Sequence, residues 1–162
     1  MHIDRTYSSP NYNERKLPVT MIVLHYTGRP SCAEAITGWL CNPEKEVSSH
    51  YVVDEDGSIF QLVDEAKRAW HAGVSEWQGV TDINSASVGI EMQNPGEEFG
   101  YRPFPIDQMK AVAALCKDIS SRFEIKVILG HEDVAPNRKA DPGPLFDWQW
   151  LADNGVPNIH AP

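Results

Sequence analysis

Short apolar runs and one long helical stripe predict a domain that mixes strands with helices. Residues 20–26, Thr-Met-Ile-Val-Leu-His-Tyr, form an apolar run that is too short for a helix and is typical of a buried strand. Similar runs predict strands at 49–53, 58–63, 86–92 and 126–129. The acidic turn Asp-Glu-Asp-Gly at 54–57 lies between two of these runs and predicts a hairpin, so part of the sheet should be antiparallel.

The clearest helix is predicted over residues 106–123, where apolar side chains recur every three or four positions. These are Ile106, Met109, Val112, Ala113, Cys116, Ile119 and Phe123. Ser31 and Glu34 have the spacing of a capping box, which predicts a second helix running to about Cys41. Asp147 is placed to cap a short helix over 148–153. Strands interleaved with helices predict an α/β fold with a central mixed β-sheet flanked by helices.

The length of 162 residues is enough for one solid hydrophobic core, so we expect a single domain. Residues 1–18 are rich in Ser, Pro, Asn and Tyr and are expected to form an irregular lead-in. The domain is then expected to occupy residues 19–155, with a C-terminal tail over 156–162.

The charge of the chain excludes some classes of binding partner, and its cysteine content bears on the cellular compartment. The 14 Lys and Arg against 23 Asp and Glu give a net charge of −9, which argues against nucleic acid and anionic membranes as partners. The longest apolar run, 21–24, is far too short to span a membrane. Three cysteines make a poor disulfide framework and are expected to be reduced. With no apolar leader in view, the expected compartment is the cytoplasm.

Two histidines at predicted strand ends indicate where the chemistry lies. His25 ends the first strand, His131 follows the last, and Asp141 comes ten residues later in a proline-rich loop. Side chains at the carboxyl ends of strands meet at one edge of a sheet. Two imidazoles and a carboxylate suit a zinc ion with an open fourth position. The alternative from spacing alone is that these histidines are structural.

Glu91 and Lys139 add to this picture, each with an alternative interpretation. Glu91 lies in an otherwise apolar strand and could act as a general base beside the metal, or could be an outward, solvated position. Lys139 precedes Asp141 by two residues and could stabilise a developing oxyanion, or could be a solvated loop lysine.

Five blocks in order give the chain a family resemblance. They are Leu-His-Tyr-Thr at 24–27, Ser-Ser-His-Tyr-Val-Val at 48–53 with Asp-Gly at 56–57, Ala-Trp-His-Ala-Gly at 69–73, Val-Gly-Ile-Glu at 88–91, and Gly-His at 130–131 through Lys-Ala-Asp-Pro-Gly-Pro at 139–144. This pattern resembles the zinc-dependent N-acetylmuramoyl-L-alanine amidases, a class that includes the peptidoglycan recognition proteins. It is most similar to the recycling-type and lipoprotein-type amidases of Gram-negative bacteria.

The resemblance implies roles for individual residues. It makes His25, His131 and Asp141 the ligands of one Zn²⁺ per chain, and Glu91 and Lys139 the catalytic residues. His50 matches a family position on the second predicted strand, and the alternative is that it is a structural histidine. Residues expected to line the site or contact the substrate are Tyr26, Trp70, His71 and Arg138, the last because a guanidinium matches the carboxylates of stem peptides.

The implied fold is a single peptidoglycan recognition protein-like domain with helices on both faces of a mixed sheet. The implied reaction is hydrolysis of the amide between N-acetylmuramic acid, or its 1,6-anhydro form, and L-alanine in peptidoglycan fragments (muropeptides). The alternative is a non-catalytic peptidoglycan-binding domain. A monomer is expected. A periplasmic protein or an outer-membrane lipoprotein, with its leader removed, is the alternative to the cytoplasm.

Overall fold

A computed structural model describes residues 1–160 and contains a six-stranded mixed sheet beside a small two-stranded one. Across the large sheet the strands are β1 (Ile3–Asp4), β5 (Ile59–Gln61), β4 (Tyr51–Val53), β7 (Ser87–Met92), β3 (Met21–Tyr26) and β8 (Val127–Gly130). Every neighbouring pair is parallel except β4 and β5, which form the predicted hairpin. The small sheet pairs β2 (Tyr12–Glu14) with β6 (Lys67–Ala69).

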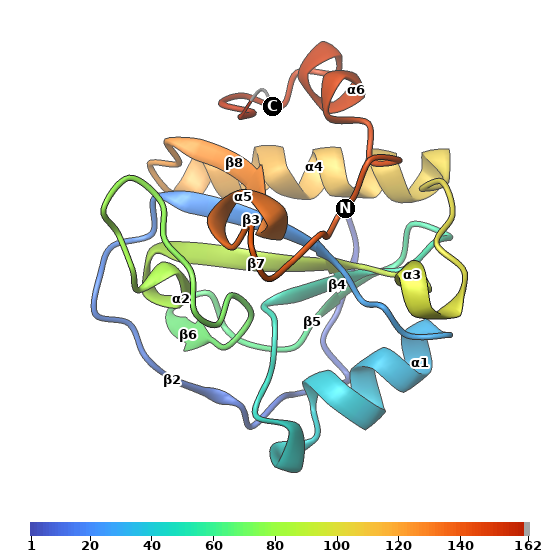
Figure 1. Cartoon of the computed structure of the whole chain (residues 1–162), viewed down its shortest axis with the longest axis horizontal. Helices are drawn as coiled ribbons and strands as arrows, with labels where there is room; N and C mark the ends of the chain where they lie inside the picture. Colours follow the sequence, from blue (N-terminus) through green and yellow to red (C-terminus); the bar gives the residue numbers. More distant parts are fainter. Residues whose placement is uncertain (161–162) are drawn as a thin grey trace.

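Helices cover both faces of the large sheet, as predicted. They are α1 (Cys32–Glu34), α2 (Ile83–Ala86), α3 (Gly96–Phe99), α4 (Ile106–Arg122), α5 (His131–Val134) and α6 (Trp148–Asp153), with the π-helix η1 (Ala35–Leu40) and the 3-10 helix η2 (Pro43–Lys45). In Figure 1 the long helix α4 lies behind the sheet, whereas α2 and α5 lie in front of it. The fold class predicted from the sequence is therefore confirmed.

Alternate residues of β3 face two different apolar layers. Ile22 and Leu24 belong to the main core with the apolar stripe of α4, and Met21 and Val23 pack with α2 and α5 on the opposite face. A third cluster, between β4 and the helical segment α1–η1, lies beside this second layer. By the two-residue period of a strand, His25 lies on the same face as Met21 and Val23.

Two predicted helix starts have the expected caps. The Ser31 hydroxyl accepts from the Glu34 backbone N–H at 3.2 Å, and the Asp147 carboxylate accepts from Trp150 N–H at 2.9 Å. The first helix changes from α to π geometry at Ala35, which the apolar pattern did not indicate.

Four details differ from the sequence predictions. Residues 1–18 are not wholly irregular, because β1 and β2 pair with strands more than 50 positions away, which a local pattern cannot show. The strand β6 was not predicted for the same reason. Ile106 starts α4 but is 52% exposed, since the first turn extends past the core. In the predicted tail, Ile159 forms a bridge to Ile128, and residues 161–162 lie outside the described part.

No helix between residues 1 and 160 has the length and apolar content needed to cross a bilayer. The cysteines Cys32, Cys41 and Cys116 are all unpaired, and Cys32 and Cys116 are buried. Burial raises the pKa of the Cys116 thiol to about 12, so this cysteine behaves as a small apolar core residue.

Candidate metal centre and active site

Three parallel strands end at one edge of the sheet and bring polar side chains together there. His25 is the penultimate residue of β3 and pairs in register with Glu91 of the neighbouring strand β7. His131 follows the last residue of β8 and begins α5. The expectation that strand ends would bring these side chains to one place therefore agrees with the structure.

His25, His131 and Asp141 converge on one point, with one ligand atom of each lying within 4.8 Å of the others. The Nδ1 atoms of the two histidines are 3.0 Å apart. The Asp141 carboxylate lies 3.2 Å from Nδ1 of His25 and 3.3 Å from Nδ1 of His131. All three side chains are buried, and no other His, Cys, Asp or Glu cluster in residues 1–160 has this geometry.

The donor set fits a zinc ion. Zinc takes imidazole nitrogens and carboxylate oxygens at about 2.0–2.2 Å in tetrahedral geometry, which places two ligand atoms about 3.3 Å from each other. The three separations here, 3.0, 3.2 and 3.3 Å, match that spacing closely. Three protein ligands leave one position open, as in catalytic zinc sites.

Contacts behind the three side chains hold them in place. The second ring nitrogen of His131, Nε2, lies 2.9 Å from the Ala72 carbonyl, and Nε2 of His25 lies 3.0 Å from Nδ1 of His71. The loop that carries Asp141 is fixed by its own backbone, since the Glu132 N–H donates to the Asp141 carbonyl at 2.9 Å. Metal ligands are usually oriented by such outer contacts.

Glu91 lies at the same site but is not one of the three converging residues. Its Oε2 atom is buried and has no hydrogen-bond partner among the described residues. Burial raises the pKa of Glu91 well above its usual value, the charge of Asp141 adds to this, and the charge of Lys139 opposes it. Lys139 is exposed and lines the same cavity. A carboxyl group with a raised pKa in a cleft suits proton transfer.

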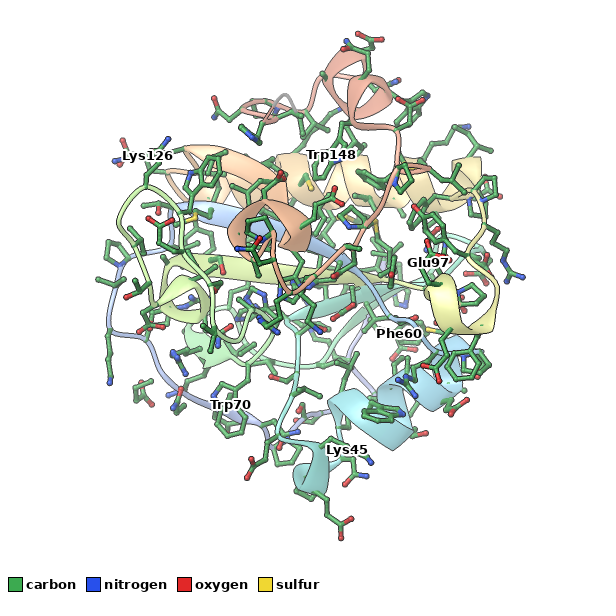
Figure 2. All side chains as sticks on the ribbon, in the orientation of Figure 1. Lys45, Phe60, Trp70, Glu97, Lys126 and Trp148 are labelled. Carbon is green, nitrogen blue, oxygen red and sulfur yellow. The ribbon has the colours of Figure 1, made fainter. Side chains whose placement is uncertain are left out.

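The cavity in front of these residues has a volume of about 500 Å³ and is lined by all the residues predicted for the site. Tyr26 and Trp70 are half-buried in its wall, and His71 is 7% exposed. Two points on the wall of this cavity are labelled in Figure 2, Trp70 at the lower left and Glu97 at the right. The Arg138 guanidinium donates to the carbonyls of Ala72 at 2.7 Å and Val74 at 3.0 Å, so it holds the loop beside the site.

Three buried histidines make the metal-free protein sensitive to acid. Burial lowers the pKa of His25 to about 4, with a further contribution from His131, and lowers that of His50 to about 3, with a further contribution from Arg15. Burial and neighbouring imidazoles lower the pKa of His71 well below its usual value. In the unfolded chain these groups take up protons near pH 6.5, so stability is full above that pH and is lost as the pH falls below it.

We therefore expect the free energy of unfolding of the metal-free protein to fall between pH 7 and pH 5. His25 and His50 each contribute a loss of about 2 kcal/mol, and His71 acts in the same direction. The raised pKa of Glu91 acts in the opposite direction, but one group can offset at most about 2.7 kcal/mol over two pH units. The net loss is then at least about 1 kcal/mol, measurable by urea unfolding at each pH. In Glu91→Gln the loss should be larger, because the opposing group is gone. A stability that stays constant or rises on acidification would contradict this.

Two residues that contact the site were not predicted to belong to it. Ser87 and Gly89 alternate with buried apolar residues on β7 and lie on the same face as Glu91. The Ser87 hydroxyl is 3.1 Å from Nε2 of His71, and an added Cβ at Gly89 would lie 2.4 Å from Cγ of the His71 ring. The alternation on β7 could be seen in the sequence as an outward, solvated face, but only the fold shows that Ser87 and Gly89 lie behind the His71 ring, which lines the cavity.

Comparison with protein families matches residues 15–144 to the N-acetylmuramoyl-L-alanine amidase model. The N-acetylmuramoyl-L-alanine amidase AmiD of Escherichia coli K12 is 40% identical over 152 residues, covering 85% of this chain and 54% of the relative. The 1,6-anhydro-N-acetylmuramyl-L-alanine amidase AmpD of Haemophilus influenzae is 31% identical over 169 residues, covering 90% of this chain and 88% of the relative. The chain thus spans about half the length of the first of these relatives.

Solved structures give the same result. The complex of E. coli AmiD with the substrate anhydro-N-acetylmuramic acid-L-Ala-D-gamma-Glu-L-Lys has a TM-score of 0.76 at 39% identity, covering 85% of this chain and 58% of that chain. A structure of a selenomethionine derivative of AmpD has a TM-score of 0.77 at 32% identity, covering 93% of both chains.

Proposed function

The chain belongs to the N-acetylmuramoyl-L-alanine amidase family, and from this we propose that it is a zinc-dependent hydrolase of muropeptides. The bond cleaved is the amide between the lactyl group of N-acetylmuramic acid, or its 1,6-anhydro form, and L-alanine. The observation that carries the proposal is the convergence of two imidazole nitrogens and one carboxylate at the floor of a cavity, with a buried, unpartnered carboxylate oxygen beside them.

His25, His131 and Asp141 would hold the zinc ion. When bound, the ion supplies a Lewis acid that polarises the scissile carbonyl and makes water a better nucleophile near neutral pH. The chain supplies the remaining functions. Because each of the three ligands is buried and fixed by the fold, the site is organised before the substrate arrives.

Glu91 moves the protons in the proposed reaction. Its carboxylate takes one proton from the attacking water as the new carbon–oxygen bond forms, and returns it to the nitrogen of L-alanine as the carbon–nitrogen bond breaks. The products are the free muramic carboxyl group and a peptide with a free amino terminus. The Lys139 ammonium, on the cavity wall, stabilises the negative charge that develops on the carbonyl oxygen.

Zinc content and product analysis of the purified protein test this function. We expect about one zinc ion per chain and release of L-alanyl peptides from anhydro-muropeptides, with activity lost on chelation and restored by zinc. A protein that binds muropeptides without releasing peptide would be the non-catalytic binding domain instead. Comparing turnover of anhydro and reducing-end substrates then identifies the preferred muramic acid.

We also propose that the protein is a monomer and that it acts in the cytoplasm. The three unpaired cysteines support a reducing compartment. Fractionation of the native host measures the compartment, and recovery in the periplasm or the outer membrane would contradict the proposal. Light scattering measures the oligomeric state.

A further inference from the structure

The ring nitrogen of His25 that faces away from the cluster is the start of a buried chain of contacts. His25 Nε2 lies 3.0 Å from Nδ1 of His71, and Nε2 of His71 lies 3.1 Å from the Ser87 hydroxyl. That hydroxyl donates in turn to the Ile83 carbonyl at 2.6 Å. All three side chains in this chain of contacts are buried, so water does not compete for them.

The direction of each hydrogen bond in this series follows from its last member, the Ile83 carbonyl. A carbonyl only accepts, and a serine hydroxyl has one proton, so Ser87 accepts from His71 Nε2–H. His71 is buried and contacts no carboxylate, so it is neutral and has a single N–H. Its Nδ1 must therefore accept, and His25 must donate through Nε2. This places the only proton of His25 on Nε2 and leaves a lone pair on Nδ1.

His131 is also protonated on Nε2, and a single contact is enough to determine this. Its Nε2 faces the Ala72 carbonyl at 2.9 Å and must donate, which leaves a lone pair on Nδ1 as well. The two lone pairs then face each other across 3.0 Å, with the Asp141 carboxylate beside both. Three acceptors converge with no proton between them, an arrangement that a cation stabilises.

The position of His71 is set by the backbone of its neighbours. An added Cβ at Gly89 would lie within 2.4–2.7 Å of three atoms of the His71 ring, so the ring occupies space that only glycine leaves free. The backbone N–H of His71 donates to Oδ1 of Asn84 at 3.0 Å, which fixes the main chain that carries the ring. The ring is thus packed against β7, and the main chain that carries it is held by Asn84 of α2.

We propose that His71 and Ser87 are positioning residues that fix the tautomer of His25, so that its Nδ1 is ready to bind the metal ion. This inference rests on the zinc site of the proposed function. It gives His71 and Ser87 a role in metal binding that does not depend on contact with the substrate. Outer partners of metal-binding histidines typically change metal affinity 10- to 100-fold. The effect should therefore appear in zinc binding itself, without substrate.

The first test compares two variants of similar size, His71→Asn and His71→Leu. The Asn side chain keeps an oxygen acceptor near the former Nδ1, whereas Leu keeps the bulk but has no acceptor. We expect His71→Leu to bind Zn²⁺ about 10- to 100-fold more weakly than the parent in a chelator competition, and His71→Asn to recover most of that loss. Ser87→Ala should weaken binding by a smaller factor. Equal zinc affinity in the parent and His71→Leu would overturn the proposal.

The second test needs no variant and therefore no assumption about folding. In the metal-free parent, ¹H–¹⁵N spectra of the imidazole rings report which nitrogen of each histidine is protonated. We expect the proton on Nε2 of His25, His71 and His131 alike. A His25 ring protonated on Nδ1 would overturn the proposal.

The outcomes separate this inference from the proposed function. If the parent binds no zinc, the metal site itself is wrong. If the parent binds one zinc ion but His71→Leu binds it equally tightly, the zinc site stands and the positioning role of His71 and Ser87 fails.

Discussion

Replacing Glu91 with glutamine is expected to lower kcat for muropeptide hydrolysis roughly 100- to 10,000-fold, the usual range for loss of a general base. The amide has nearly the same shape as the carboxylate but cannot accept the proton of the attacking water. Because Glu91 is not one of the three converging ligands, the variant should keep one zinc ion per chain. Steady-state kinetics together with metal analysis measure both quantities.

The matched control is Glu124→Gln, which removes an exposed carboxylate just beyond the end of α4. This variant should keep the parent rate. A Glu91→Gln protein with full activity would refute the assignment of Glu91 as the base. A Glu91→Gln protein without zinc would show instead that Glu91 supports the metal site.

The second large effect is expected from Asp141→Asn, which should abolish both zinc retention and hydrolysis. The substitution is nearly isosteric at a site that is 6% exposed, so packing is preserved while the charged oxygen ligand is lost. We expect zinc affinity to fall at least about 100-fold, more than for a residue that only contacts a ligand. Competition with a chelator measures the affinity, and peptide release measures the activity.

Asp153→Asn, on the exposed surface of α6, makes the same chemical change away from the site and should alter neither property. Thermal unfolding of the metal-free forms of both variants shows whether the fold is intact. If Asp141→Asn retained zinc with the affinity of the parent, Asp141 would not be a ligand, and the proposed site would have to be redrawn around the two histidines.

The sequence predicted the elements that local pattern determines. The apolar run of β3 and the helical stripe of α4 carry their periodicity within one segment, and the Ser31 cap depends on residues three positions apart. The strands β1, β2 and β6 were not predicted because they are two or three residues long and exist only through pairing with distant partners.

In the candidate site, too, local pattern could be predicted from the sequence and tertiary contacts could not. His25 and His131 could be placed from the sequence because strand ends meet at one edge of a parallel sheet. The contact between His71 and His25 could not, since it depends on the loop before α2 folding over the sheet and on the space left at Gly89. Arg138 was expected to contact substrate, and its bonds to the 72–74 loop depend on tertiary packing in the same way.

The spacing of the three ligands along the chain has a consequence for the life of the protein in the cell. His25 and His131 are 106 positions apart, and Asp141 follows ten residues later, so a ribosome must synthesise the chain as far as residue 141 before all three side chains can bind one ion. An ion bound only by the finished fold adds about 4 kcal/mol to the free energy of unfolding when its free concentration is 1,000 times the Kd. If the proposed zinc site is correct, zinc depletion would therefore lower the stability of the folded protein as well as its activity, and so increase its degradation by proteases.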